Sequence, residues 1–287
     1  MKGKTCVLTG ATSGLGRATA EALGRKGANL FLVGRNEKRG MILAKGLRGL
    51  HRAHVEFIQA DLSANEEVRA LAARINSNGA CINVLINNAG GRFDRFQESV
   101  DGVEMTFATN HLGHFLLTLS LLRKLDCPEG GRVITVTSSA HRSARLEGIS
   151  WSASPAAYDR KQAYARSKLA NVLFAFELAR RLRCTRIVSN AVDPGGVATN
   201  FAGNNGLQAW AKHMLSHWVR GDLVSASTAA ETIVWLATEP KLASLTGRLF
   251  RQRREIEASP DARNARLGAE LWNESIKLTN TQSTLCP

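Results

Sequence analysis

Short apolar segments alternate along the chain with longer amphipathic segments, a pattern typical of repeated βα units. Strands buried on both faces and joined by helices predict one α/β domain over residues 1–287, with a doubly wound parallel sheet between helical layers and a ligand crevice at the carboxyl ends of its strands. The predicted strands are Thr5–Leu8, Asn29–Val33, His54–Gln59, Val84–Asn87, Arg132–Thr137 and Ile187–Val192, with another near Arg248 and Phe250, and the predicted helices include Leu15–Lys26, Glu66–Ser77, Leu112–Lys124 and Ala163–Leu182.

The sequence TGATSGLG, residues 9–16, lies between the first predicted strand and the first predicted helix. Its glycines at 10, 14 and 16 allow a sharp turn, a close approach of backbone to a pyrophosphate and tight packing of the helix. The helix N-terminus offers N–H groups and the positive end of its dipole to an anion. This position favours a dinucleotide-binding, Rossmann-type turn over a tight turn without a ligand.

The end of the second predicted strand indicates which dinucleotide binds. An acidic side chain there usually accepts hydrogen bonds from the ribose 2′-hydroxyl of NAD, whereas the 2′-phosphate of NADP needs a cation. This chain has Gly34 and Arg35 at that place, and Arg17 offers a second cation. Because a guanidinium binds phosphate through two hydrogen bonds, NADP is favoured. Glu37 keeps NAD open as the alternative.

The segment YARSKLAN, residues 164–171, places Tyr164 and Lys168 four residues apart. On an α-helix this spacing puts both side chains on one face, displaced by about 6 Å along the axis. A phenol has a pKa of about 10, and a neighbouring ammonium lowers it by stabilising the phenolate. Such a tyrosine can donate a proton to a carbonyl oxygen or remove one from an alcohol. By itself, however, the pair usually marks an ordinary helix surface.

Composition and charge exclude several classes of protein. Hydrophobic residues make up 44% and charged residues 22% of the chain, as in ordinary globular proteins. The five cysteines form no CxxC pair, so neither a disulfide framework nor a zinc site is indicated. The formal net charge of +14 attracts anions, but the basic residues are dispersed and lack an aromatic-basic pattern, so we expect no nucleic-acid partner.

The most apolar run, Leu112–Leu122, is interrupted by His114 and is much shorter than the roughly 20 residues that span a bilayer. The first predicted strand leaves no room for a signal peptide before it. We therefore expect a cytoplasmic protein with at most peripheral membrane contact.

Six elements in order resemble the short-chain dehydrogenase/reductase family over about residues 4 to 200: TGATSGLG, NNAG at 87–90, Asn110, the serine pair 138–139, YARSK, and PGGVAT at 194–199. The resemblance implies that Tyr164 is the general acid/base and that Lys168 lowers its pKa and holds the nicotinamide ribose. It also implies that Ser139 orients the substrate carbonyl, with Ser138 as the neighbouring alternative. Asn110 would support a water in a proton relay.

The resemblance further implies a cofactor site along the strand ends. Asp61 corresponds to an aspartate that contacts adenine, unless it only caps the following helix. Thr199 would lie near the nicotinamide, unless it is only a turn residue. The implied cofactor-binding residues are Gly10, Thr12, Ser13, Gly14, Leu15, Gly16, Arg17, Arg35, Asp61, Leu62, Asn87, Ala89, Gly90, Tyr164, Lys168, Pro194, Gly195, Val197 and Thr199.

Within the family, the sequence is most similar to the retinol dehydrogenase-like branch. The segments TSSAHRSARLEG and SKLANVLFAFELARRL carry this similarity, as does the interval of 25 residues from Ser139 to Tyr164, which implies an inserted loop around Leu146–Arg160. The family usually builds a variable substrate lid in the segment that corresponds here to residues 200–230.

In that segment, an apolar stripe lies on one predicted helical face and comprises Trp210, Met214, Leu215 and Trp218. An apolar lid suggests a lipophilic substrate; a stripe that faces the core and a weak contact with a membrane surface are the other interpretations. The histidine pairs 111/114 and 213/217 have metal-chelating spacings but no nearby carboxylate or cysteine, so we expect surface or lid histidines and no metal.

The sequence therefore predicts an NADP-dependent oxidoreductase that interconverts a carbonyl and an alcohol on a lipophilic substrate. Reduction of an activated C=C bond and a non-catalytic NADPH-sensing module are the alternatives. The resemblance also implies a homodimer formed through the helix of Tyr164, although the inserted loop could cover that surface.

Overall fold

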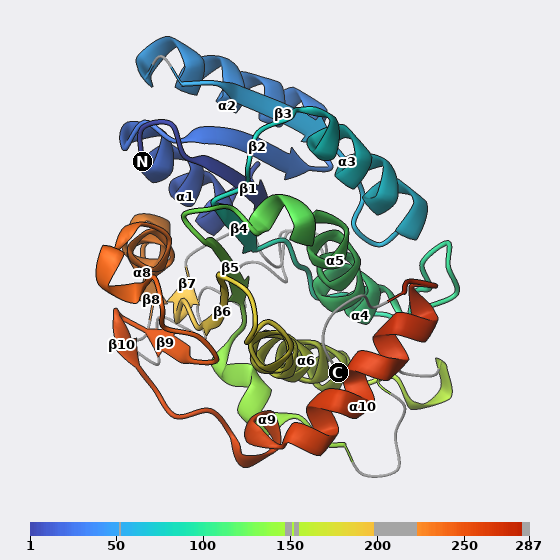
Figure 1. The fold of residues 1–287 in the computed structure, drawn as a ribbon. Helices are drawn as coiled ribbons and strands as arrows, with labels where there is room; N and C mark the ends of the chain where they lie inside the picture. Colours follow the sequence, from blue (N-terminus) through green and yellow to red (C-terminus); the bar gives the residue numbers. More distant parts are fainter. Residues whose placement is uncertain (52, 147–150, 152–154, 198–222, 283–287) are drawn as a thin grey trace.

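One large, mostly parallel sheet organises the protein (Figure 1). The computed structural model describes residues 1–51, 53–146, 151, 155–197 and 223–282. Within these residues the sheet has eight strands in the order β10-β9-β6-β5-β4-β1-β2-β3, and only the β9–β10 pair is antiparallel. The strands are β1 (Thr5–Thr9), β2 (Asn29–Gly34), β3 (Val55–Gln59), β4 (Val84–Asn87), β5 (Gly131–Val136), β6 (Ile187–Val192), β9 (Leu249–Arg251) and β10 (Arg254–Glu255), and β7 (Gly196–Val197) pairs with β8 (Leu223–Val224) in a separate small sheet.

Helices cover both faces of the sheet, which confirms the predicted doubly wound α/β fold. Helices α1, α2 and α8 lie on one face, whereas α3, α5 and α6 lie on the other, with α10 packed outside α6. The helices are α1 (Gly14–Arg25), α2 (Glu37–His51), α3 (Asn65–Ser77), α4 (Met105–Phe107), α5 (Gly113–Leu125), α6 (Arg160–Arg181), α8 (Ala226–Thr238), α9 (Pro260–Arg263) and α10 (Ala265–Leu278).

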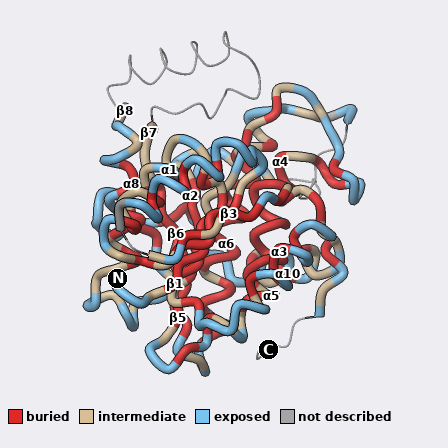
Figure 2. Tube along the Cα trace, turned by 90° about the horizontal axis from the view of Figure 1, so that it is seen from above, coloured by how far each residue is buried: buried red, intermediate tan, exposed pale blue. Residues whose placement is uncertain are grey.

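Alternation along the strands builds the two halves of the core. In β1, Cys6 and Leu8 pack toward α1 and α2, while Val7 packs toward α3 and α5. All five residues of β1 are buried, as expected for a central strand covered on both faces. Figure 2 shows the buried residues concentrated in the strands and in the inward sides of the helices.

Helix α2 was not among the helices that the sequence pattern singled out. Three glycines weaken its intrinsic helix propensity. One of them, Gly40, lets the helix lie against the ring of Phe57, because a Cβ at this position would fall 2.1 Å from Cε2 of that ring. Packing on β3 therefore stabilises a helix that its composition alone disfavours.

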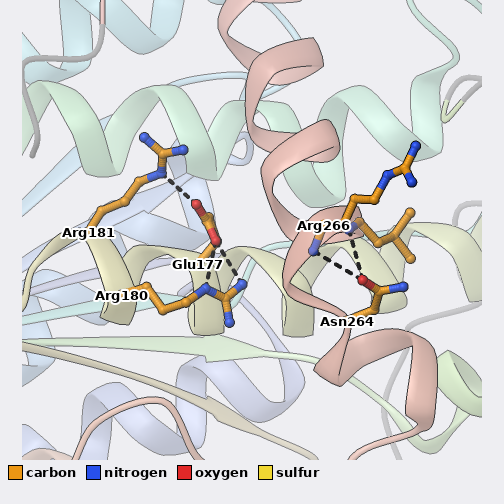
Figure 3. A network of polar contacts seen from close by, with 6 residues as sticks. Glu177, Arg180, Arg181, Asn264 and Arg266 are labelled. Atoms are coloured by element: carbon orange, nitrogen blue, oxygen red, sulfur yellow. Dashed lines mark hydrogen bonds and ion pairs between the residues drawn. The ribbon is translucent and has the colours of Figure 1, made fainter. Parts of the chain in front are cut away.

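Figure 3 shows polar contacts within α6, around Glu177, and at the start of α10, around Asn264. Within α6, the carboxylate of Glu177 forms ion pairs of 2.7 Å with Arg180 and Arg181. The guanidinium of Arg181 also lies 4.6 Å from the ring centroid of Trp272 on α10. The side chain of Asn264 caps the start of α10. The contact between Arg181 and Trp272 therefore joins α10 to α6, the helix that carries Tyr164.

A π-helical turn, Ala108–Leu112, joins α4 to α5 and contains Asn110. The apolar run that follows is buried between the sheet, α3 and α6, which explains its hydrophobicity. In the part of the chain that the structure describes, every helix is too short or too polar to cross a lipid bilayer.

The structure corrects the expectation of surface histidines. His111 and His114 are both buried, at 0% and 1% exposure. They belong to the π-helical turn and the first turn of α5, where the helix packs into the core. No group of three metal-binding side chains occurs among the described residues. The second histidine pair, His213 and His217, and the apolar stripe of the expected lid lie outside the described residues.

Candidate active site

The glycine-rich turn between β1 and α1 lies at the carboxyl ends of the strands and leaves space for a ligand against its backbone. Gly10 and Gly14 have φ of 68° and 49°, in the left-handed region that glycine favours. A Cβ at Gly16 would fall 2.1 Å from the carbonyl oxygen of Gly10, so only glycine allows this approach. Ser13 occupies the N-cap of α1 without a side-chain capping bond, and the first turn has no acidic residue. The first N–H groups of α1 are therefore suited to a pyrophosphate.

The end of β2 carries Gly34, followed by Arg35. A Cβ at Gly34 would fall 2.9 Å from the methyl carbon of Thr12, so a side chain there would require Thr12 to shift. The next residue, Arg35, is exposed, and no acidic side chain among the described residues pairs with it. Arg17, the second predicted cation, is exposed too but is paired with Glu21 at 2.8 Å.

Asp61 follows β3, and the alternative that it caps the next helix is wrong. Helix α3 begins at Asn65, with Ala64 at its N-cap. The carboxylate of Asp61 instead accepts hydrogen bonds of 2.9 and 2.8 Å from the backbone N–H and hydroxyl of Ser63. Leu62 is buried in the core at 5% exposure, which leaves only its backbone to face a cofactor.

The turn after β4 is bonded to the end of β1. The hydroxyl oxygen of Thr9 accepts hydrogen bonds from the backbone N–H groups of Asn88 and Ala89, at 2.9 and 3.0 Å. The side-chain amide of Asn88 donates to the carbonyl of Thr9 at 2.8 Å. Asn87, the predicted residue, points instead to Thr118 of α5, with an amide-to-hydroxyl distance of 2.9 Å.

The turn then passes close to the catalytic candidates. A Cβ at Gly90 would fall 3.0 Å from Oδ1 of Asn110 and 3.5 Å from Nζ of Lys168. The amide of Asn110 exchanges two hydrogen bonds with the backbone of Gly91, at 2.8 and 3.0 Å. It also donates to Ser167 Oγ at 2.9 Å, and Ser167 donates to the carbonyl of Tyr164 at 2.8 Å. The structure thus brings the predicted Asn110 to the helix of the Tyr–Lys pair.

Tyr164 and Lys168 lie together on α6, as their spacing predicts. Nζ of Lys168 is 5.6 Å from the centroid of the Tyr164 ring and 3.4 Å from the carbonyl oxygen of Val136. Burial lowers the pKa of Lys168 to about 8, and the carboxylate of Asp193 opposes this effect. At neutral pH, below that pKa, the ammonium form predominates.

The phenol of Tyr164 is neutral at neutral pH. Burial raises its pKa to about 12, and the charge of Asp193 adds to this, while a hydrogen bond with the side chain of Ser138 and the charge of Arg92 act in the opposite direction. A neutral phenol can donate a proton, whereas acting as a base requires a further cation nearby.

The hydroxyl that contacts Tyr164 belongs to Ser138, the alternative member of the serine pair. Ser138 precedes a short 3-10 turn, Ser139–Ser143, and also accepts a hydrogen bond from the N–H of Ala140 at 3.3 Å. Ser139 is exposed at the start of that turn. Its role in orienting a substrate stays a prediction.

The segment after β6 begins with a buried carboxylate. Asp193 is 2% exposed, accepts a hydrogen bond of 3.0 Å from the N–H of Gly195, and has Arg251 of β9 at 3.7 Å. Pro194 and Gly195 follow it and Val197 lies in β7, beside the strand ends, whereas Thr199 lies outside the described residues.

A pocket of about 620 Å³ adjoins Pro194 and Gly195 at the N-terminal end of α8. Its other walls include the polar side chains of Glu231, Arg251 and Arg253. Pro194, Val224 and Ala229 add apolar surface, so the described walls are of mixed polarity.

Sequence reasoning missed three residues of the site. Thr9, Asn88 and Asp193 were passed over because each is a common polar residue at a strand end. Their positions inside TGATSGLG, NNAG and DPGG were the available signal, since each immediately adjoins a residue that the sequence did single out.

The assembled site can bind a dinucleotide and transfer a proton. The glycine-rich turn at Gly10–Gly16 and the cation at Arg35 fit a phosphorylated dinucleotide lying across the strand ends. The partly exposed Tyr164, with Lys168 and Ser138 beside it, provides a proton donor next to the path of such a cofactor. This combination fits hydride transfer coupled to proton transfer.

Comparisons with known proteins agree with this geometry. The family model described as short chain dehydrogenase matches residues 4–210. Retinol dehydrogenase 13 from Homo sapiens is 34% identical over 98% of this chain and 86% of that protein. Polyprenol dehydrogenase from Mus musculus is 37% identical over 96% of this chain and 84% of that protein. The crystal structure of an uncharacterized protein from Mycobacterium Paratuberculosis has a TM-score of 0.76 and 31% identity, and the match covers 98% of this chain and 95% of that one.

The family model covers most of the chain, and the similarity to retinol dehydrogenases extends over nearly all of it. The residues that the model spans form strands β1 to β6 of the Rossmann-type sheet and carry the Tyr164–Lys168 pair. The chain belongs to the short-chain dehydrogenase/reductase family, in its retinol dehydrogenase-like branch, and is an NAD(P)-dependent oxidoreductase of alcohols and carbonyls.

Proposed function

We propose that the protein is an NADP-preferring enzyme that interconverts a carbonyl and an alcohol on a lipophilic substrate, with Tyr164 as the general acid/base. The observation that carries this proposal is the convergence of Tyr164, Lys168 and Ser138, together with the turn at residues 88–90, which contacts both Lys168 and the glycine-rich turn before α1. Two relatives are named for retinol and polyprenol, which are apolar alcohols, and these names support a lipophilic substrate.

In the direction of reduction, NADPH would supply a hydride to the carbonyl carbon when bound along the strand ends. Tyr164 donates its phenolic proton to the carbonyl oxygen, and its high pKa of about 12 keeps that proton available at neutral pH. The ammonium of Lys168, 5.6 Å from the ring, stabilises the phenolate that this transfer leaves. The hydroxyl of Ser138 supports the phenol in its reactive orientation.

The proposed preference for NADP rests on Arg35 and on the lack of a carboxylate at Gly34. Gly34 carries no carboxylate that would select NAD, and an acidic residue there would require Thr12 to shift, since a Cβ would fall 2.9 Å from its methyl carbon. The exposed guanidinium of Arg35 suits the 2′-phosphate. The remaining predicted contacts, from Gly10 to Gly195 along the strand ends, would hold the pyrophosphate and the nicotinamide half.

Replacing the general acid tests the mechanism. We expect Tyr164→Phe to lower kcat with NADPH and a lipophilic aldehyde or ketone by about 10²- to 10⁴-fold, because it removes the proton donor and keeps the ring. NADPH affinity, measured by quenching of tryptophan fluorescence, should stay unchanged. Turnover equal to that of the wild type would exclude Tyr164 as the acid.

The two serines can be separated by paired alanine variants. We expect Ser138→Ala to lower kcat/KM roughly tenfold or more, because it removes a hydrogen bond that stabilises the phenolate. Ser139→Ala serves as the matched variant and should have the smaller effect, since its side chain is exposed. A larger loss of kcat/KM for Ser139→Ala would instead assign the orientation of the substrate carbonyl to Ser139, as the family resemblance implies.

Cofactor preference depends on one guanidinium. We expect Arg35→Ala to lower kcat/KM for NADPH roughly tenfold to a hundredfold and to leave the value for NADH unchanged, because only the 2′-phosphate loses a charged hydrogen-bond donor. Lys45→Ala, an exposed change further along α2, is the control for general loss of positive charge. Equal losses with both cofactors would contradict the assignment of Arg35.

A further inference from the structure

His114 is a buried histidine whose two ring nitrogens contact the two halves of the candidate site. Its Nε2 lies 2.9 Å from the hydroxyl oxygen of Thr9, the last residue of β1 before Gly10. Its Nδ1 lies 3.0 Å from the carbonyl oxygen of Asn110 in the π-helical turn. One side chain therefore bridges the cofactor-side turn and the catalytic side of the cleft.

The donors and acceptors fix the direction of this bridge. A carbonyl oxygen only accepts, so Nδ1 of His114 carries the proton and donates it to Asn110. Thr9 Oγ1 already accepts two N–H bonds from the turn after β4, so its own proton is available to Nε2. The other acceptor near that hydroxyl, the carbonyl of Ile86, is farther away at 3.3 Å.

A neutral ring is required for this pattern. Burial lowers the pKa of His114 to about 4; the bond to the Asn110 carbonyl opposes this, and the charge of Lys168 adds to it. The imidazole is therefore neutral at neutral pH, with one nitrogen donating and the other accepting.

The bridge continues to the backbone of the catalytic tyrosine. The side chain of Asn110 bonds Ser167, and Ser167 bonds the carbonyl of Tyr164. An unbroken chain of hydrogen bonds thus runs from β1, through His114 and the π-helical turn, to α6. A histidine that only fills space in the core would not need hydrogen-bond partners on both Thr9 and Asn110.

We propose that His114 is a positioning residue for the reaction, which holds the π-helical turn at Asn110 in register with the cofactor-side turn at Thr9 and so places Tyr164 relative to the cofactor. This inference rests on the proposed function. His114 acts through Asn110 and does not touch the reacting atoms.

The kinetic test compares two buried histidines of adjoining helical segments, His114 in α5 and His111 in the π-helical turn. His114→Phe fills the space but breaks the bridge, and we expect kcat to fall about 10²-fold with little change in KM for the carbonyl, because misplacement of the reacting groups affects the chemical step. His111→Phe is the matched control. It breaks the hydrogen bond to Ser275 on α10, which is not part of the chain of hydrogen bonds from Thr9 to Tyr164, and should leave kcat close to that of the wild type. Equal losses in kcat for both folded variants, or no loss at His114, would overturn the proposal.

Thr9, the partner of His114 on β1, allows a second test with a pair of conservative variants. Thr9→Ser keeps the hydroxyl and should keep kcat, whereas Thr9→Val should lower it. Because Thr9 and His114 act through one chain, the double variant Thr9→Val/His114→Phe should lose no more activity than the worse single variant. Additive losses in the double variant would contradict a shared role.

A measurement without turnover separates this inference from the proposed function. In ¹⁵N-histidine NMR spectra of the full chain, we expect His114 to show protonated Nδ1 and unprotonated Nε2, with no titration between about pH 5 and 8. Addition of NADPH should shift its resonances, because the cofactor contacts the turn after Thr9. The opposite tautomer, or a spectrum that NADPH does not shift, would overturn the positioning role of His114 even if the enzyme is active. If the expected spectrum is found but the wild-type protein reduces no carbonyl, the proposed function is overturned instead.

Discussion

The hydroxyl of Thr9 is the point at which the site is held together. It accepts hydrogen bonds from the turn after β4 and lies within 2.9 Å of His114 on α5, so one oxygen joins three elements. A buried hydroxyl with all of its partners in place is stabilising, and loss of one partner would leave a buried polar group at a cost of about 1–3 kcal/mol. The close approach of Gly10 and Gly16 depends on this junction, because the backbone of β1 and the turn after β4 must stay in contact there.

Burial shifts the pKa values of the two proposed catalytic side chains. Withdrawal from water raises the pKa of Tyr164 and lowers that of Lys168, so the phenol keeps its proton and the ammonium becomes easier to deprotonate. The carboxylate of Asp193 counteracts the second effect and helps Lys168 to keep its charge. That carboxylate is itself held by the N–H of Gly195 and by Arg251. The electrostatic balance of the site therefore depends on a residue after β6 as much as on the Tyr–Lys pair.

The sheet and the Tyr–Lys pair could be predicted from the sequence, because both depend on short-range periodicity and on motifs that adjoin strand ends. The apolar alternation placed β1 through β6 within one or two residues. Helix α2 was not singled out, because its stability comes from contact between Gly40 and Phe57 rather than from its composition.

The partners of individual polar residues could not be predicted in the same way. Whether Ser138 or Ser139 meets Tyr164 depends on the conformation of one turn, since the two hydroxyls are adjacent in sequence. The sequence also suggested surface histidines, and only the packing of α5 shows His111 and His114 inside the core. The burial of these side chains depends on tertiary packing, which a local sequence pattern does not predict.

The central claim is a hydride transfer to a carbonyl carbon coupled to protonation of its oxygen. The most direct measurement uses NADPH deuterated at the transferable position, an aldehyde or ketone substrate that also contains a conjugated C=C bond, and NMR of the product. The account predicts deuterium on the carbon that bears the new hydroxyl, with the C=C bond intact. Deuterium on a carbon of the former double bond, or no transfer from bound NADPH to any such substrate, would contradict it.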